Sequence, residues 1–247
     1  MSDDDKSILK QWVDAGMPYG NADDLPTPPH FTSGWRLPRE PDLVLEMHRE
    51  GYKVPAEGTV EYQYFVADPK FTEDKWVTAA QVILGNTAIV HHCIVFIRPP
   101  DGESFRNVGM LAGYVPGQTS APLPPGYARQ VKAGSRLVFQ MHYTPNGTEQ
   151  QDHSYIGLRF IDQKDVKKLL RGGVAANHKF EIPAHAESHP VVANYQSSRD
   201  ELLLEMTPHM HLRGKSFRYE AFYPDGTQEV LLDIPNYDFN WQHAYQL

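Results

Sequence analysis

The sequence predicts an all-β protein made of two antiparallel, jelly-roll-like β-sandwich domains, with a short helix before them. Short runs rich in β-branched and aromatic residues recur along most of the chain, and turn signals containing glycine separate them. Helical periodicity is confined to the N-terminus. Many short strands joined by Gly/Pro turns, with little helical pattern, are typical of sandwiches and barrels.

The N-terminal segment is expected to contain the helix. Apolar residues recur there at helical spacing: Ile8, Leu9, Trp12 and Val13. Gly16 follows as a stop signal, so the pattern predicts a helix over residues 5–15. Residues 21–41 are polar and proline-rich, which is typical of a linker. Residues 1–40 are therefore expected to form a helix and a linker rather than a sandwich.

The remaining chain is expected to form two sandwich domains, residues 41–165 and 166–247. Strands are predicted at residues 59–66, 76–84, 88–97, 135–143, 155–160, 201–206, 217–223 and 228–232. The polar, Lys/Arg-rich residues 162–173 are expected to join the two domains, and residues 109–127, with four prolines, to form a long irregular loop.

Composition excludes several classes of function. The net charge is −8, from 31 acidic and 23 basic residues, and no cluster of Lys and Arg with interleaved aromatic residues is present, so no nucleic-acid partner is expected. No apolar run is long enough to cross a bilayer, and the acidic first residues lack the basic and then apolar pattern of a signal peptide. The single cysteine, Cys93, leaves His, Met and carboxylates as the metal ligands available.

Five of the 12 histidines fall into three short apolar stretches: His91 with His92, then His142, then His209 with His211. Neutral imidazole is the commonest protein ligand for transition metals, so these five residues are the candidate metal ligands.

The backbone geometry decides whether the histidines of each motif could bind one ion. On a strand, residues i and i+2 face the same way, so His209 and His211 could reach one ion. Adjacent residues on a regular strand face opposite ways, so His91 and His92 could share an ion only at a bulge, a strand end or a distorted turn. His142 stands alone in its strand. Taken singly, each motif also fits ordinary core or surface histidines.

Together, the order of the motifs and their neighbours resembles the copper type II, ascorbate-dependent monooxygenase superfamily. Peptidylglycine α-hydroxylating and dopamine β-monooxygenases belong to that superfamily. The resemblance covers roughly residues 40–247 and rests on the His-His pair entering an apolar strand, Gln140-Met141-His142-Tyr143, and His-x-His followed by Gly214-Lys215. Residues 234–242, Ile-Pro-Asn-Tyr-Asp-Phe-Asn-Trp-Gln, resemble the bacterial branch.

The resemblance implies one copper ion in each sandwich. His91, His92 and His142 would hold the copper that transfers electrons. His209 and His211 would hold the oxygen-binding copper, where catalysis occurs. Ascorbate or another reductant would supply two single electrons, and O₂ would hydroxylate a C–H bond of a small-molecule or peptide substrate.

Two departures from the family pattern matter for activity. The family completes the second copper site with a Met sulfur well after His-x-His, and here no Met follows His211. The chain is therefore expected to be C-terminally truncated, with an incomplete second site and little or no hydroxylase activity as a fragment. The amidating enzyme anchors its peptide with an Arg two residues before His-x-His, where this chain has Thr207, which argues against that peptide substrate.

The N-terminal helix resembles the last helix of a small c-type cytochrome domain. This resemblance rests on Trp12 to Gly16 and their neighbours. It implies that residues 1–40 are the remnant of a preceding haem domain, which would be the electron donor, and that the full-length protein is periplasmic or otherwise extracytoplasmic.

Three other functions remain open from the sequence. A non-catalytic copper-binding or electron-transfer module would bind copper without oxygen-dependent turnover. A zinc-dependent hydrolytic β-barrel protein would hold a redox-silent ion with His209, His211 and a carboxylate. A carbohydrate- or protein-binding sandwich would bind no stoichiometric metal.

Overall fold

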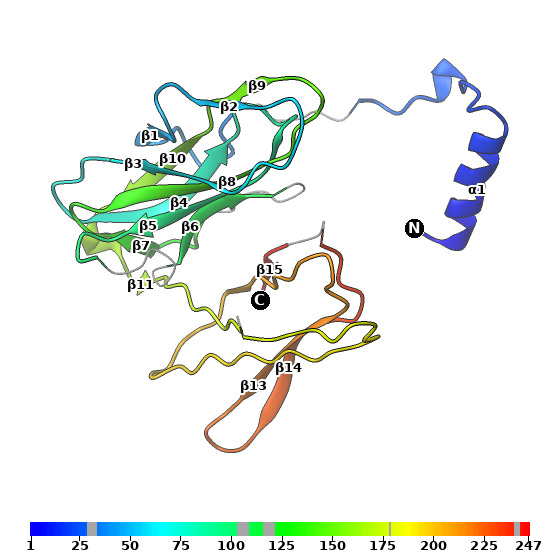
Figure 1. The fold of residues 1–247 in the computed structure, drawn as a ribbon. Coiled ribbons are helices and arrows are strands. Elements are labelled where there is room, and N and C mark those ends of the chain that lie inside the picture. Colours follow the sequence, from blue (N-terminus) through cyan, green and yellow to red (C-terminus); the bar gives the residue numbers. More distant parts are fainter. Residues whose placement is uncertain (29–33, 103–108, 116–121, 178, 240–242) are drawn as a thin grey trace. The chain divides into compact units, whose positions relative to one another are not determined.

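The structure, a computed structural model, describes residues 1–28, 34–102, 109–115, 122–177, 179–239 and 243–247 (Figure 1). Two compact units divide the chain at Ser33 and Gly34. The expected subdivision of the second unit into residues 41–165 and 166–247 stays a prediction. Residues 116–121, within the expected loop, and residues 240–242, at the end of the stretch that resembles the bacterial branch, lie outside the described residues.

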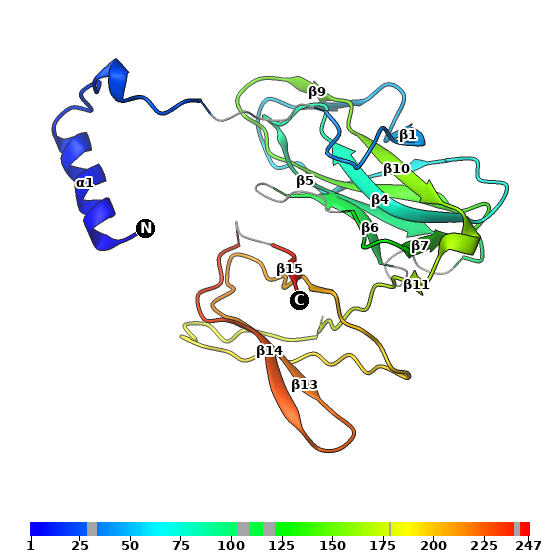
Figure 2. The ribbon, with the colours of Figure 1, turned by 180° about the vertical axis from the view of Figure 1, so that it is seen from behind.

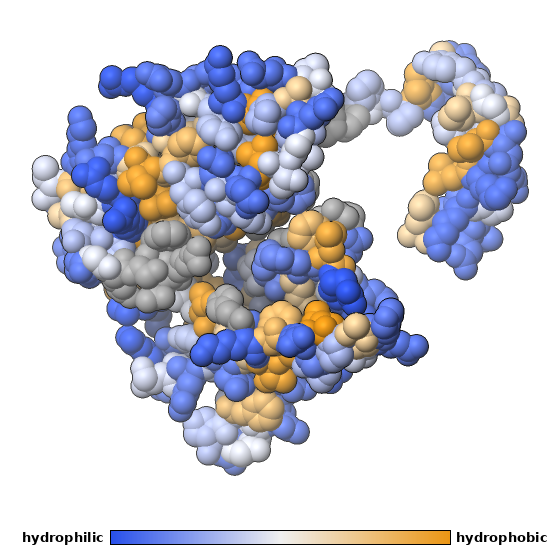
Figure 3. Space-filling view, viewed as in Figure 1, coloured by the Kyte–Doolittle hydropathy of each residue, from blue (hydrophilic) through white to orange (hydrophobic). Residues whose placement is uncertain are grey.

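The first unit contains the expected helix, α1 (Asp3–Asp14), and the short 3₁₀ helix η1 (Ala22–Asp24). Ser2 begins α1 with a capping box, in which its hydroxyl accepts from Asp5 N and the Asp5 carboxylate accepts from Ser2 N. Gly16, with φ of 80°, follows the helix end. No residue of α1 is buried, and its apolar side chains are visible at the surface in Figure 3.

The second unit contains two stacked sheets, which confirms the expected all-β class (Figure 1). The five-stranded sheet has the order β1 (Leu43–Glu46), β10 (Tyr155–Ile161), β4 (Lys75–Ile83), β7 (Tyr127–Val131) and β11 (Lys168–Leu169). The four-stranded sheet has the order β3 (Gln63–Ala67), β8 (Arg136–Tyr143), β5 (Val90–Arg98) and β6 (Met110–Tyr114). All pairings are antiparallel except the parallel pairing of β11 with β7.

The hydrophobic core lies between these two sheets. Its buried side chains come from alternate positions of the facing strands, among them Val95, Phe139 and Met141 of one sheet and Val77 and Leu158 of the other. Because alternate residues of a strand face opposite ways, the intervening residues of β5 and β8 lie on the outer face of the four-stranded sheet. That outer face carries the first histidine cluster.

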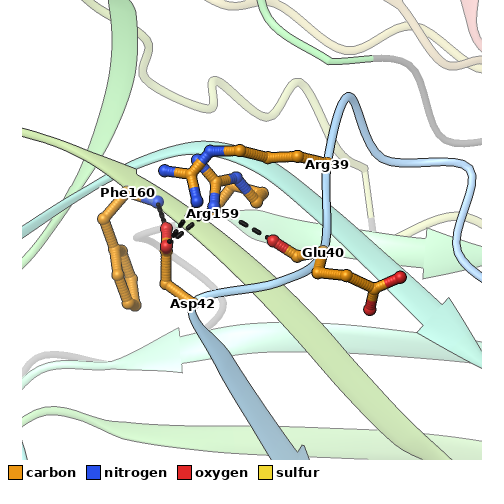
Figure 4. A network of polar contacts seen from close by, with 5 residues as sticks. All are labelled: Arg39, Glu40, Asp42, Arg159 and Phe160. Atoms are coloured by element: carbon orange, nitrogen blue, oxygen red, sulfur yellow. Dashed lines mark hydrogen bonds and ion pairs between the residues drawn. The ribbon is translucent and has the colours of Figure 1, made fainter.

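A partly buried ion pair fastens the segment before β1 to β10 (Figure 4). Arg159 Nη1 donates to the Asp42 carboxylate at 2.7 Å and to the Glu40 carbonyl at 3.0 Å. The backbone N–H of Phe160 donates to the other Asp42 oxygen at 2.8 Å, and Arg39 contacts the same carboxylate from outside. The buried guanidinium is therefore both paired and hydrogen-bonded, as burial of a charge requires.

A buried carboxylate links the end of β8, next to His142, to the segments before β5 and after β9. Asp152, in the short strand β9 (Gln150–Asp152), accepts hydrogen bonds from the Tyr143 hydroxyl and from Ser154 Oγ. It also accepts from the backbone N–H of Asn86, which precedes β5. β9 itself pairs with β2 (Tyr52–Val54). Tyr143 follows His142, so this cluster fixes the backbone at the end of β8.

The C-terminal residues form two small two-stranded sheets. The hairpin β13 (Phe217–Phe222) and β14 (Gln228–Ile234) is seen in Figure 2, and β12 (Glu205–Met206) pairs with β15 (Tyr245–Gln246). The predicted strand at 201–206 is thus only two residues long. Among the described residues after 166, the buried hydrophobic side chains are Met206 and Tyr237. Among the described residues, no helix is long and apolar enough to cross a bilayer.

Candidate metal centre

A β-bulge brings His91 and His92 onto one site. β5 pairs with β8 so that Val90 lies opposite Tyr143 while His92 lies opposite His142. Two residues of β5 therefore face one step of β8, which makes His91 the extra residue of the bulge. A bulge was one of the arrangements expected to let these neighbours share an ion, and the structure has it.

His142 joins the same site from the neighbouring strand. Residues directly opposite one another in an antiparallel pair project on the same face, so His142 and His92 both lie on the outer face of the four-stranded sheet. The three ring centroids are 4.9 to 5.4 Å apart. One ring nitrogen from each histidine falls in a group whose members all lie within 4.8 Å of one another.

The nitrogen atoms of this cluster fit a bound metal ion. His91 Nδ1 and His92 Nδ1 are 3.2 Å apart. His142 Nδ1 is buried and has no hydrogen-bond partner among the described residues. A buried polar atom without a partner costs free energy, and a metal ion is one partner that all three rings could share. The cluster of His91, His92 and His142 could therefore bind a metal ion.

The surroundings of the cluster favour neutral imidazole. Burial, followed by the neighbouring His142, His91 and His209, lowers the pKa of His92 to about 3. Burial and then His91 also lower the pKa of His142. Neutral imidazole is the form that binds metals, so at pH 7 these two residues need not release a proton before binding.

Tyr62 contacts the cluster and was not among the candidate residues predicted from the sequence. Its ring centroid lies 5.0 Å from that of His142 and 5.6 Å from that of His92. Tyr64 pairs with Gln140 in the β3–β8 ladder, so continuing the register by two residues places Tyr62 opposite His142. The register of β3 with β8 places Tyr62 at this site. The pattern of residue types in the sequence does not reveal that register.

His209 and His211 form a second pair, and their backbone is not a strand. The strand geometry that would let residues i and i+2 reach one ion is absent here, because β12 ends at Met206 and the next regular element is β13. Pro208 lacks the N–H that a continuing ladder needs. The two rings are nevertheless 5.1 Å apart, at 83° to one another, and both residues are exposed.

Phe239 contacts both histidine groups. Its ring is stacked on His91, with centroids 6.1 Å apart and an interplanar angle of 9°. It also meets His211 edge to face at 6.4 Å. The structure therefore places all five predicted ligands near one another, with the ring of Phe239 in contact with both groups. Phe239 was not singled out from the sequence as part of the site.

Cys93 is not part of the histidine cluster, because its side chain lies in the core. Cys93 is fully buried in the core, its side chain opposite Met141 in the ladder, and burial raises the pKa of its thiol. It packs as a small core residue. Among the described His, Cys, Asp and Glu side chains, the group with metal-ligand spacing is His91, His92 and His142.

Comparisons with protein-family models, with curated proteins and with solved structures found no match for this chain.

Proposed function

We propose that this chain binds copper at His91, His92 and His142, and that these residues and the His209–His211 pair belong to a copper-dependent monooxygenase, in which the pair holds the second copper. The observation that carries the proposal is the convergence of three imidazoles at the β5 bulge, with the buried Nδ1 of His142 lacking a partner. An all-imidazole site is chemically suited to copper, zinc, iron or nickel. The order of the five histidines in the sequence favours copper among these.

The residues of the first site would hold the ion without needing to rearrange. Cross-strand pairing fixes His92 against His142, and the bulge turns His91 toward the same ion. The Asp152 cluster holds Tyr143, the residue after His142, by a hydrogen bond of 3.0 Å. Such supporting contacts orient metal ligands and help to set affinity.

Copper bound at both sites would supply one-electron redox chemistry for the hydroxylation of a C–H bond by O₂. One oxygen atom enters the C–H bond and the other leaves as water, while ascorbate or another donor supplies two electrons and two protons enter from solvent. The chain's own part is to hold the two ions near one another. The contacts of Phe239 with both His91 and His211 support that closeness.

Redox cycling of the copper-loaded protein tests this function. Under anaerobic conditions, ascorbate should remove the electron paramagnetic resonance signal of Cu(II), and O₂ should restore it. His142→Ala should lose the part of the signal due to the first site, and His209→Ala the part due to the second. His189→Ala, which changes an exposed histidine outside both clusters, should behave as the wild type does.

A second candidate, a copper-binding or electron-transfer module, is favoured by one observation. Among the described His, Cys, Asp and Glu residues, no third ligand joins His209 and His211 in a group with metal-ligand spacing. For this candidate, the reduced protein would be reoxidised slowly by O₂, and His209→Ala would leave copper content and redox behaviour unchanged. Rapid reoxidation that depends on His209 would decide for the monooxygenase.

A further inference from the structure

The His209–His211 pair needs support from outside its own segment. Both imidazoles are exposed, and residues 207–216 contain no helix or strand. An irregular backbone with exposed side chains does not hold two rings in one geometry without tertiary contacts. Residues 237–239, which follow β14, supply contacts of this kind. The inference drawn from them rests on the proposed second copper site.

Tyr237 holds the residue between the two histidines. Its hydroxyl accepts a hydrogen bond from the backbone N–H of Met210 at 2.9 Å and donates one to the Met210 carbonyl at 2.8 Å. A single hydroxyl thus satisfies both backbone groups of Met210, which a strand ladder would otherwise do. Because Met210 is bonded to His209 on one side and His211 on the other, its orientation fixes the backbone of both.

The ring of Tyr237 closes the turn that follows His211. Gly214 N–H donates to the His211 carbonyl at 2.8 Å, and Tyr237 N–H donates to the Lys215 carbonyl at 2.9 Å. A Cβ on Gly214 would lie 2.7 Å from the Tyr237 ring and 2.9 Å from Met210 Cβ. Only a glycine leaves room for the ring to pack this closely. Tyr237 is 9% exposed, in a part of the chain with few buried side chains.

Phe239 extends the contact to the first histidine cluster. It lies two residues after Tyr237. Its ring is stacked on His91 and meets the His211 ring edge to face. One short segment therefore contacts the second histidine pair through Tyr237 and both groups through Phe239.

We propose that Tyr237 and Phe239 form an aromatic clasp that positions the His209–His211 pair for metal binding beside the three-histidine cluster. Tyr237 sets the geometry of the pair, and Phe239 sets its placement against His91. Both are positioning residues. A purely structural role would lower the stability of the fold and leave the affinities of the two sites in an unchanged ratio.

Copper titration with a competing chelator measures both affinities in the full chain. Tyr237→Phe keeps the ring and removes only the hydroxyl with its two hydrogen bonds. We expect the affinity of the second site to fall about tenfold, with the affinity of the first site unchanged, since two neutral hydrogen bonds are lost. The Cu(II) resonance of the second site should broaden as its geometry becomes less uniform. Phe239→Leu should broaden the distribution of distances between the two bound Cu(II) ions, which pulsed dipolar resonance measures.

Tyr223→Phe is the matched control. It removes a hydroxyl that donates to Glu229 at 2.7 Å within the β13–β14 hairpin and touches neither histidine group in the described contacts. It should leave both affinities unchanged.

The outcomes separate this inference from the function on which it rests. A wild-type chain that binds one copper or none overturns the two-site function and the clasp together. If the wild-type chain binds two ions, and Tyr237→Phe and Phe239→Leu retain both affinities and the same distance distribution, the clasp alone is overturned. Equal weakening of both sites in Tyr237→Phe would mean a general structural role and would also overturn it.

Discussion

The imidazole of His92 is buried beside three other histidines. Burial first, and then His142, His91 and His209, lower its pKa from 6.5 to about 3. Between these two values the unfolded chain binds a proton at this position that the folded chain does not. Stability is therefore retained above about pH 6.5 and is lost as the pH falls toward 3.

The first prediction is that His92→Gln flattens this acid dependence in metal-free protein. Each proton bound only by the unfolded chain contributes a slope of at most about 1.4 kcal/mol per pH unit. Glutamine does not titrate, so the loss of stability between pH 6.5 and pH 5 should be smaller in the variant. Urea unfolding at the two pH values measures it, and an unchanged slope would mean that His92 is not the group responsible.

Gly85 has no room for a side chain, because backbone atoms of another segment lie close to it. It precedes the Asn86 N–H that donates to Asp152, and a Cβ there would lie 2.4 Å from His153 N and 2.6 Å from His153 C. Both atoms belong to the backbone and cannot rotate away. Any side chain at this position must therefore push two segments of chain apart.

The second prediction is that Gly85→Ala lowers the free energy of unfolding by about 2–3 kcal/mol, the range of an overpacked core position. Gly20→Ala is the control, because nothing lies within 4 Å of its added Cβ and its φ is not positive. Chemical denaturation of both variants provides the comparison. Equal stability of the two would show that the chain near His153 can move aside.

At the scale of elements, the ion pair of Arg159 with Asp42 fastens the chain before β1 to β10. The Arg159 side chain is 7% exposed and the Asp42 side chain 28%. Removing one partner of a buried pair leaves the other charge poorly solvated. The partial exposure of Asp42, and its contact with Arg39, moderate that cost.

The third prediction is that Arg159→Met lowers the free energy of unfolding by about 2–3 kcal/mol. Arg218→Met is the matched control, since Arg218 pairs with Asp233 at the surface of the β13–β14 hairpin, and it should change stability little. Thermal unfolding at low and high salt would measure both. If Arg159→Met lowered the free energy of unfolding no more than Arg218→Met does, solvent would reach the Arg159–Asp42 pair freely.

Strands with strong alternation were predictable from the sequence, whereas short strands defined by their partners were not. β4, β5, β8, β10 and the β13–β14 hairpin lie where β-formers and turn residues predicted them. β6 lies within the predicted irregular loop, because its pairing with β5 outweighs the weak local preference of a segment that contains Gly113. The strand predicted at 201–206 extends only over Glu205–Met206, since its single partner, β15, is equally short.

The candidate site was partly predictable from the sequence. The sequence singled out His91, His92 and His142, which the structure groups, and a bulge was one of the three arrangements expected to let His91 and His92 share an ion. The role of His209 and His211 as ligands stays a prediction. Tyr62 was missed because its place opposite His142 depends on the register of β3 with β8. Tyr237 and Phe239 were missed because their contacts with Met210 and His91 join segments far apart in the chain.

At the scale of the whole molecule, the two compact units differ in how they are stabilised. Residues 34–247 contain the hydrophobic core and every candidate ligand, whereas α1 buries no residue. A helix without buried side chains is held by its caps and local pairs, such as Lys10 with Asp14, and these contribute little to the stability of the rest.

The fourth prediction is that removal of residues 1–28 leaves the unfolding midpoint and copper content of the remaining chain unchanged. The measurements are thermal unfolding and metal analysis of the shortened and full chains side by side. A large fall in either quantity would show that the first unit contributes contacts to the second.

The most direct test of the account is the copper content of the protein after equilibration with copper and excess zinc, followed by removal of loosely bound metal. We expect the wild type to retain tightly bound copper and His142→Ala to lose the ion of the three-histidine cluster. His189→Ala should retain the wild-type content. Retention of zinc in place of copper, or no tightly bound metal in the wild type, would contradict the proposed copper centre.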